Sequence, residues 1–162
     1  AARSSVVGKR ADTRAVLERL GRVMGKLNKQ CDVAIDLPPN VPWFRGDEGD
    51  LEEMAGNLLD NGCKWAGSEV RLSAREASVS GNRSVEIVVE DNGPGLTEAE
   101  AEQVLRRGVR LDEKTPGSGL GLDIVKELVD IYGGDLTLTR SDLGGLRATL
   151  RLPAARQARQ QT

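Results

Sequence analysis

The 162-residue chain contains no histidine, and this absence removes several catalytic chemistries at once. Without an imidazole, the chain cannot build a Ser-His-Asp or Cys-His nucleophile system from its own residues. Its two cysteines, Cys31 and Cys63, form no CxxC pair, which argues against a zinc site. A disulfide between them cannot be assigned from sequence alone. We therefore expect reduced thiols and a cytosolic compartment.

Aromatic residues, charge of one sign and long apolar runs are also scarce. With 23 basic and 25 acidic residues, the net charge is −2 and no basic cluster stands out, so we expect no nucleic-acid partner. The chain has no run of about 18 apolar residues and no signal-peptide pattern, which predicts a soluble chain. The core must rest on Leu, Val and Ile, because the only aromatic residues are Trp43, Phe44, Trp65 and Tyr132.

The order of patterned segments predicts a single domain over residues 11–153, with a poorly ordered segment 1–10 and a flexible tail 154–162. Apolar residues at helical spacing predict helices at 12–29, 46–65 and 120–132, and a short helical pattern follows residue 96. Alternating patterns predict strands at 31–37, 41–45, 69–75, 84–90, 136–139 and 146–152. This order favours an α/β fold: a two-layer sandwich whose mixed, mostly antiparallel sheet is covered on one face by helices.

Three polar residues of the second predicted helix fall on one helical face. Asn57, Asn61 and Lys64 are spaced i, i+4 and i+7, and we expect their face to point away from the apolar stripe that includes Leu58. Amide oxygens suit Mg²⁺, and a lysine suits phosphate. Taken alone, the pattern is more typical of a solvated helix face.

Two glycine-bearing segments follow. Asp91 ends a predicted strand and begins Asp91-Asn-Gly93-Pro-Gly95, where a carboxylate could accept a hydrogen bond from the exocyclic amine of adenine. The alternative is an ordinary turn. Further along, a second segment opens a predicted helix, whose N-terminal N–H groups can bind phosphate. That segment matches neither a Walker A loop nor a Rossmann fingerprint, and its glycines could serve packing alone. It reads Gly117-Ser118-Gly119-Leu120-Gly121.

Basic residues lie between the two glycine segments, among them Arg106, Arg107, Arg110 and Lys114. They could form a mobile loop over a triphosphate or an ordinary mixed-charge surface. Each of the four signals is weak alone, but their conjunction in this order predicts an ATP-binding domain.

Together the segments resemble the N box and the two glycine boxes of the catalytic, ATP-binding domain of sensor histidine kinases, within the GHKL superfamily. The likeness spans roughly residues 26–152. Arg107-Gly108, Arg110 and Pro116 further resemble the PhoQ-type sensor kinases. The resemblance implies the Bergerat ATP-binding fold, with ATP and Mg²⁺ as ligands.

It also implies roles for individual residues. Asp91 would read adenine beside Trp65, while Gly93 and Gly95 shape the base pocket. Asn61 would bind Mg²⁺ with support from Asn57. Residues 96–116 would form a lid over the nucleotide. The residues implied to contact phosphate are Lys64, Arg110, Gly117, Ser118, Gly119, Leu120 and Gly121.

The chain departs from the family pattern at several positions. Leu105 occupies the expected place of a phenylalanine, Gly62 stands where alanine is usual, and Trp65 replaces a common tyrosine. The phospho-accepting histidine of the family lies on a separate helical dimerisation domain. We therefore expect a fragment, the monomeric cytoplasmic domain of an inner-membrane sensor, whose partners are that dimerisation domain and a response regulator of a two-component system.

Two other functions compete with histidine phosphorylation. A stand-alone GHKL ATPase, or a related serine kinase, is the first. In the hydrolytic branch a glutamate occupies the place of Asn57 as general base, whereas an amide cannot take that proton. The second alternative is a degenerate nucleotide-binding module that supports protein interaction without phosphotransfer.

Overall fold

The computed structural model describes residues 8–107 and 120–156, and within them five strands form one sheet covered by helices. No helix of this part is both long enough and apolar enough to cross a membrane. The elements are α1 (Thr13–Leu27), β1 (Asp32–Asp36), α2 (Glu48–Trp65), β2 (Glu69–Val79), β3 (Asn82–Asp91), α3 (Glu98–Arg107), α4 (Leu120–Tyr132), β4 (Asp135–Arg140) and β5 (Leu146–Pro153).

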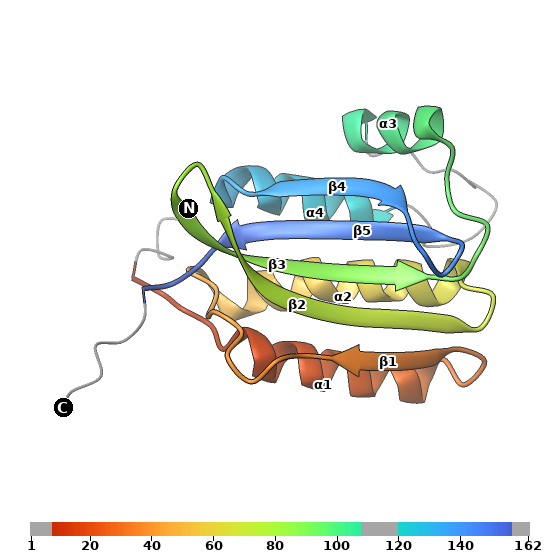
Figure 1. Cartoon of the computed structure of the whole chain (residues 1–162), viewed down its shortest axis with the longest axis horizontal. Helices are drawn as coiled ribbons and strands as arrows, with labels where there is room; N and C mark the ends of the chain where they lie inside the picture. Colours follow the sequence, from red (N-terminus) through yellow and green to blue (C-terminus); the bar gives the residue numbers. More distant parts are fainter. Residues whose placement is uncertain (1–7, 108–119, 157–162) are drawn as a thin grey trace.

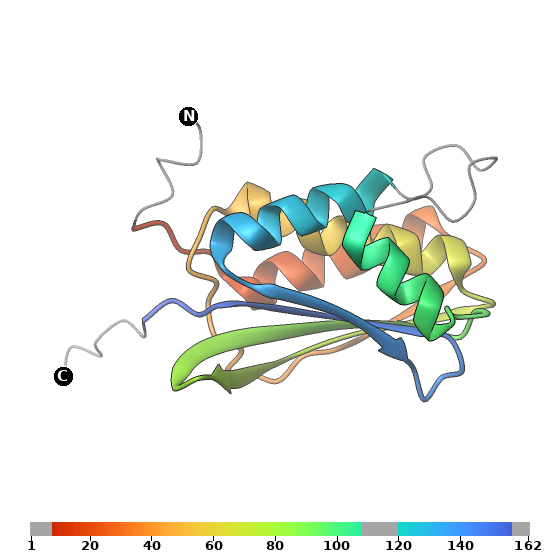
Figure 2. The same cartoon turned by 90° about the horizontal axis from the view of Figure 1, so that it is seen from above.

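The strand order is β1-β2-β3-β5-β4, in which β1 pairs with β2 in parallel and the other neighbours are antiparallel. In Figure 1 the strands lie in front of α1, α2 and α4, and Figure 2 shows the sheet and the helices as two layers. The predicted two-layer α/β sandwich, with a mostly antiparallel sheet, is therefore confirmed.

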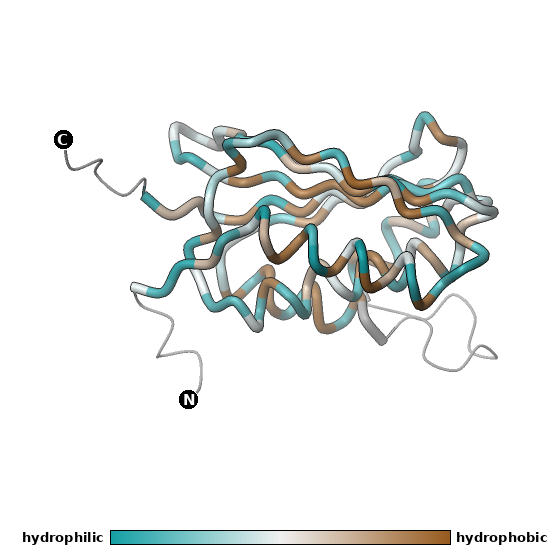
Figure 3. Tube along the Cα trace, turned by 90° about the horizontal axis from the view of Figure 1, so that it is seen from below, coloured by the Kyte–Doolittle hydropathy of each residue, from teal (hydrophilic) through white to brown (hydrophobic). Residues whose placement is uncertain are grey.

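The core lies between the two layers and is built from aliphatic side chains. Alternate residues of β3, namely Val85, Ile87 and Val89, are buried toward the helices, where Leu51 and Met54 of α2 are fully buried. The hydropathy colouring of Figure 3 shows hydrophobic positions recurring along strands and helices alike. Burial of these side chains is the main stabilising term for the sandwich.

The predicted strand at 41–45 is wrong. Only Phe44 makes ladder-like pairs, one bridge with Ala11 and one with Ala154. Pro42 has no backbone N–H to donate to a neighbouring strand. Its carbonyl oxygen accepts a hydrogen bond from the Thr13 hydroxyl rather than from the backbone amide of a neighbouring strand. A short connection therefore replaces the strand.

Packed contacts extend slightly beyond the range 11–153 at both ends. At the C-terminal end the amide of Ala155 donates to the Trp43 carbonyl oxygen at 2.7 Å. At the N-terminal end Lys9 pairs with Asp47 at 3.1 Å, and the Arg10 guanidinium lies 4.7 Å from the centre of the Trp43 ring. These residues belong to segments that the sequence predicted to be unordered or flexible.

The hairpin of β2 and β3 is longer than predicted, because a two-residue turn joins the strands. Ser80 and Gly81 both have positive φ angles, 52° and 80°, which is typical of the tight turns that match strand twist. Both strands consequently run up to the turn, and β3 carries paired residues from Asn82 to Asp91.

The cysteines are both free and buried. Burial raises the pKa of the Cys63 thiol to about 12, so the thiol stays protonated at neutral pH. The predicted reduced state fits two thiols in an apolar setting.

The open face of the sheet buries a charge. Glu86 is only 2% exposed although no helix covers it, because Arg75 of β2 and Arg151 of β5 lie over it. The arginine Nε atoms donate to the two carboxylate oxygens at 3.0 and 2.9 Å. Burial alone would raise the pKa of Glu86, but the hydrogen bonds and charges of both arginines outweigh burial and lower it. Strand β3 is thus buried on both faces.

We predict that Glu86→Gln lowers the free energy of unfolding at pH 7 by about 1–2 kcal/mol, because charge-assisted hydrogen bonds are lost. A carboxylate with a lowered folded pKa stabilises the fold above its ordinary pKa of 4.5, and this contribution is lost as the pH falls through the folded value. Urea unfolding between pH 3 and 7, roughly, should show a flatter pH profile for the variant.

The matched control is Glu76→Gln, which removes an exposed ion pair with Arg83. We expect a change below about 1 kcal/mol for this control, since solvent screens exposed pairs. Equal losses for the two variants would contradict the importance of the buried pair.

Candidate functional site

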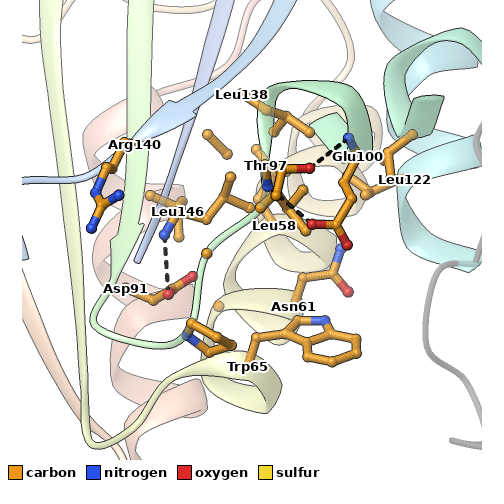
Figure 4. Close-up of a pocket in the computed structure, with 17 residues that line it drawn as sticks. Leu58, Asn61, Trp65, Asp91, Thr97, Glu100, Leu122, Leu138, Arg140 and Leu146 are labelled. Atoms are coloured by element: carbon orange, nitrogen blue, oxygen red, sulfur yellow. Dashed lines mark hydrogen bonds between the residues drawn. The ribbon is translucent and has the colours of Figure 1, made fainter. Parts of the chain in front are cut away.

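A cavity of about 580 Å³ lies where α2, α3 and the ends of β3, β4 and β5 meet. Figure 4 shows side chains from these elements converging on it. Its polar lining includes Asn61, Asp91, Thr97, Glu100 and Arg140. The remainder is largely apolar: Leu58, Val89, Leu96, Val104, Leu122, Leu138, Leu146 and Ala148. A cavity of this size, with apolar walls and a few convergent polar groups, is typical of a small-molecule site.

Asp91 is the polar group at the end of β3, and its side chain is anchored by backbone amides. The residue is 4% exposed. Its Oδ1 accepts hydrogen bonds from the Gly93 amide at 2.9 Å and the Leu146 amide at 3.3 Å, the second of which Figure 4 draws. Within the described part of the chain, no group donates to Oδ2, which leaves this oxygen for a ligand.

Burial raises the pKa of the Asp91 carboxyl, and the hydrogen bonds from Gly93 and Leu146 only partly oppose that effect. The buried carboxylate therefore has unused hydrogen-bond acceptor capacity. A ligand N–H that reaches Oδ2 would replace part of the lost hydration.

Glycines permit this close arrangement. A Cβ on Gly93 would overlap the carbonyl oxygen of Trp65. A Cβ on Gly145 would lie 2.6 Å from the Asp91 carbonyl oxygen and 2.7 Å from the Gly93 nitrogen. The Gly145 amide also donates to the Asp91 carbonyl oxygen at 3.1 Å. Gly145 was missed as a site residue, because the Gly-Gly pair before β5 reads as an ordinary hairpin turn.

Helix α2 supplies one wall through a stripe at i, i+3, i+4 and i+7: Leu58, Asn61, Gly62 and Trp65. The structure thus brings Asn61 and Trp65 to the same cavity as Asp91. The expectation that the polar face points away from Leu58 is wrong, because Leu58 and Asn61 are neighbours on the helix and share the cavity. A Cβ on Gly62 would lie 3.3 Å from Val89, so this glycine lets the helix approach the sheet closely.

Asn57 and Lys64 do not line this cavity. The Asn57 Nδ2 donates to the Glu53 carbonyl oxygen at 2.7 Å, one turn earlier in the helix. Lys64 pairs with Asp60 at 3.0 Å, also within the helix. Of the predicted polar triplet, only Asn61 is therefore placed in the cavity wall.

Several predicted phosphate contacts fall outside the described residues: Arg110, Gly117, Ser118 and Gly119. The described backbone resumes at Leu120, and Leu120 and Gly121 form the first turn of α4. Leu122 lines the cavity, which places the N-terminal turn of α4 beside it.

Helix α3 covers part of the cavity and is fixed by a capping box. The Glu100 amide donates to the Thr97 hydroxyl oxygen at 3.1 Å, and the Thr97 amide donates to Glu100 Oε1 at 3.0 Å. Val104 is 1% exposed and Leu105, at the expected phenylalanine position, is half-buried. Thr97 and Glu100 were not predicted as cavity residues, although their T-x-x-E spacing is a signal for a helix start.

The comparisons with known proteins agree with this geometry. A sequence profile of the family described as histidine kinase-, DNA gyrase B-, and HSP90-like ATPase matches residues 46–156. The chain belongs to this family. The matched range includes every element that lines the cavity, so the family assignment and the cavity concern the same part of the chain.

Two curated relatives are sensor kinases. The sensor protein kinase CarS of Pseudomonas aeruginosa is 46% identical over 129 residues, and the sensor protein PhoQ of Escherichia coli is 35% identical over 134 residues. The matches cover 78% and 82% of the chain but only 27% and 26% of the relatives. The predicted likeness to PhoQ-type kinases is confirmed, and the match to CarS has the higher identity.

A solved structure supports the same fold. The ATP binding domain of PrrB from Mycobacterium tuberculosis superposes with a TM-score of 0.73 at 29% identity, covering 90% of this chain and 96% of that one. The family's fold and its ATP-binding character therefore apply to the described chain.

We predict that Gly145→Ala lowers the free energy of unfolding by about 1–3 kcal/mol, because its Cβ would press on backbone atoms of Asp91 and Gly93. The amide of Leu146 should move away from Asp91, visible as a large shift in its backbone NMR resonance. Gly25→Ala in α1 is the control. Its Cβ would be 3.9 Å from the nearest atom, and we expect a gain of up to about 1 kcal/mol. Wild-type stability in Gly145→Ala would refute the close packing.

Proposed function

We propose that this chain is the catalytic domain of a two-component sensor histidine kinase. In this proposal residues 11–153 bind Mg-ATP and present its γ-phosphate to a histidine on a separate dimerisation domain. The observation that carries the proposal is the buried Asp91 carboxylate, with one oxygen held by two amides and the other left for a donor inside an apolar cavity.

Asp91 would select adenine. The exocyclic amine of adenine can donate to Oδ2, whereas guanine presents a carbonyl oxygen at the equivalent position and would meet the carboxylate as a second acceptor. Leu138 and Ala148 provide apolar walls for the base. Trp65, 36% exposed at the cavity, would flank the base with its indole ring, and Gly93 and Gly95 would shape the turn beside it.

Asn61 would be the protein ligand of Mg²⁺. Its amide oxygen is the kind of hard donor that the ion prefers, and the ion would keep waters and phosphate oxygens as its other ligands. Asn57 fits a supporting role, since only its Nδ2 is engaged, by Glu53, and its Oδ1 remains open within the described residues. The bound ion would neutralise negative charge on the phosphates.

The phosphates would lie toward the N-terminal turn of α4, where backbone N–H groups and the helix dipole favour anions. Leu122 at the cavity supports this direction. Lys64 would leave Asp60 to reach phosphate, and Arg110 of the lid would contact the γ-phosphate. The backbone of the second glycine box would hold the remaining oxygens: Gly117, Ser118, Gly119, Leu120 and Gly121.

The acceptor must come from outside this chain, because the chain has no histidine. The nucleophile is a neutral imidazole nitrogen of the partner domain, which attacks the γ-phosphorus while the bond to the ADP oxygen breaks. This domain contributes positioning and charge stabilisation and forms no covalent intermediate. A response regulator would then receive the phosphoryl group, and the domain itself would be the cytoplasmic, monomeric part of an inner-membrane sensor.

A stand-alone ATPase is the alternative that one observation favours. Glu100 lines the cavity and is a carboxylate of the kind that activates water. Its Oε1 is engaged by the Thr97 amide, however, and the amide of Asn57 cannot act as a base. The arrangement therefore favours phosphotransfer over hydrolysis.

Phosphotransfer is tested by mixing the chain with the dimerisation domain of its parent protein and γ-labelled ATP. We predict acid-labile, base-stable label on that domain, as expected for phosphohistidine. Asn61→Ala should cut the initial rate about 100-fold, because the metal ligand is lost. Asn40→Ala, an exposed asparagine in the loop after β1, is the control and should label normally.

Two results would count against the proposal. Rapid ATP hydrolysis without any acceptor, abolished by Glu100→Gln, would favour the ATPase. Full nucleotide occupancy without label on the acceptor domain would favour the interaction module.

A further inference from the structure

The turn between β4 and β5, residues 141–145, meets the end of β3 beside the cavity that Asp91 lines (Figure 1). We call it the β4–β5 turn. None of its residues, all of which the structure describes, belongs to the hydrophobic core, and two are glycines, of which Gly144 has a φ angle of 107°. Glycines leave a backbone many conformations unless other contacts restrict it. Polar contacts must therefore fix the position of this turn.

On the cavity side, Asp91 holds the turn and the residue that follows it. The Gly145 amide donates to the Asp91 carbonyl oxygen at 3.1 Å, and the Leu146 amide donates to Asp91 Oδ1 at 3.3 Å (Figure 4). In the proposed function Asp91 reads adenine with its other oxygen, Oδ2. The orientation of the carboxylate therefore depends on where the β4–β5 turn places the Leu146 amide.

On the opposite side, Glu90 holds the same turn. Successive strand residues point to opposite faces, so Glu90 lies on the open face of the sheet while Asp91 faces the cavity. Glu90 Oε1 accepts a hydrogen bond from the Ser141 hydroxyl at 3.0 Å, and Oε2 lies 3.9 Å from Nη1 of Arg71. Glu90 is 7% exposed and Ser141 is 4% exposed, so little water competes for this charge-assisted hydrogen bond.

Ser141 connects this contact to the rest of the turn. Its Oγ accepts a hydrogen bond from the Leu143 amide at 3.0 Å, and its own amide donates to the Gly145 carbonyl oxygen at 2.8 Å. The amide of Gly145 in turn donates to Asp91, so the contact on the open face is continuous with the contact at the cavity. The neighbouring residues Glu90 and Asp91 thus hold one turn from both faces of the sheet.

We propose that Ser141 and Glu90 are positioning residues for nucleotide binding, because from the open face they hold the β4–β5 turn where the Leu146 amide meets Asp91. Their role rests on the proposed ATP binding, and neither residue lines the cavity. Without the Ser141 hydroxyl the turn loses its restraint on one side, and the Leu146 amide moves away from Asp91 Oδ1. Asp91 then no longer presents Oδ2 in a fixed direction, and the affinity for adenine falls.

The first test uses the backbone amide NMR resonances of the nucleotide-free chain and does not depend on ATP. Ser141→Ala removes the hydroxyl with little change in volume. We expect shifts at Leu143, which loses its acceptor, and also at Gly145 and Leu146, whose amides donate to Asp91. Shifts that stop at Leu143 would overturn the proposal, because the restraint would then not reach Asp91.

Calorimetric titration with ATP measures the consequence for binding. Ser141→Ala should weaken ATP binding about threefold to tenfold, less than Asp91→Asn, because the carboxylate remains but its orientation is less fixed. Ser78→Ala is the matched control, since it removes an exposed hydroxyl from β2, and its affinity should stay within about twofold of the wild type. Equal weakening by the two serine variants would contradict a specific role for Ser141.

Two glutamates of β3 separate positioning from stability. Glu90→Ala and Glu86→Ala remove the same group from the same face of one strand, and each leaves arginine without a buried carboxylate. Both variants should unfold at lower temperature, but only Glu90→Ala should weaken ATP binding, by about tenfold. Glu90→Gln should recover most of the affinity, because its side-chain carbonyl oxygen can still accept from Ser141. Equal loss of ATP affinity in Glu86→Ala would overturn the proposal, since lower stability would then explain both.

A double-variant cycle tests whether Ser141 acts through Asp91. In the Asp91→Asn background, Ser141→Ala should weaken ATP binding by less than about twofold, because the carboxylate that Ser141 helps to orient is already lost. An NMR titration suits this comparison, since it measures weak binding. The same factor in both backgrounds would overturn the proposal, because Ser141 would then act independently of Asp91.

The results also distinguish this proposal from the proposed function. A wild type without ATP affinity, or an Asp91→Asn variant with full affinity, would overturn the reading of adenine by Asp91 and the positioning role with it. Full ATP affinity in folded Ser141→Ala, beside a loss in Asp91→Asn, would overturn the positioning role alone.

Discussion

The site depends on one contact: the end of β3 and the turn before β5 approach each other at backbone distance. Gly145 donates to the Asp91 carbonyl oxygen, and the amides of Gly93 and Leu146 hold the Asp91 carboxylate. This arrangement fixes a carboxylate that is buried and still has one oxygen available. Apolar walls then make that oxygen a selective acceptor, because little water competes for it.

Helices α2 and α3 place further side chains around the cavity beside Asp91. Helix α2 packs on the sheet through Gly62, which brings Asn61 and Trp65 to the cavity. Helix α3 is fixed over the cavity by its Thr97–Glu100 capping box. The proposed adenine end is thus built from helices and strands of the sandwich, whereas several of the proposed phosphate contacts fall outside the described residues.

The sequence predicted those features that local pattern controls. The strand that ends at Asp91 and the helix that carries Asn61 follow from apolar periodicity, and the three boxes identified the family. The missed features depend on contacts between distant segments. Gly145 becomes a site residue only because its turn meets Asp91, 54 positions earlier in the chain. Leu58 was predicted to face away from Asn61, whereas both residues line the cavity. The spacing of residues along a helix tells which side chains are neighbours, but it does not tell which face of the helix borders a cavity. Similarly, residues 41–45 looked like a strand, but Phe44 alone among them forms bridges, one with Ala11 and one with Ala154.

The most direct test of the account is a calorimetric titration of ATP and GTP, with and without Mg²⁺, into the wild type and Asp91→Asn. Burial raises the pKa of Asp91, so at neutral pH the charge opposes folding, and the variant should unfold at the same or a higher temperature. We predict magnesium-dependent binding of ATP, no binding of GTP, and loss of ATP affinity of about 100-fold or more in the folded variant. Equal binding of ATP and GTP, or unchanged ATP affinity in the variant, would contradict the claim that Asp91 reads the base.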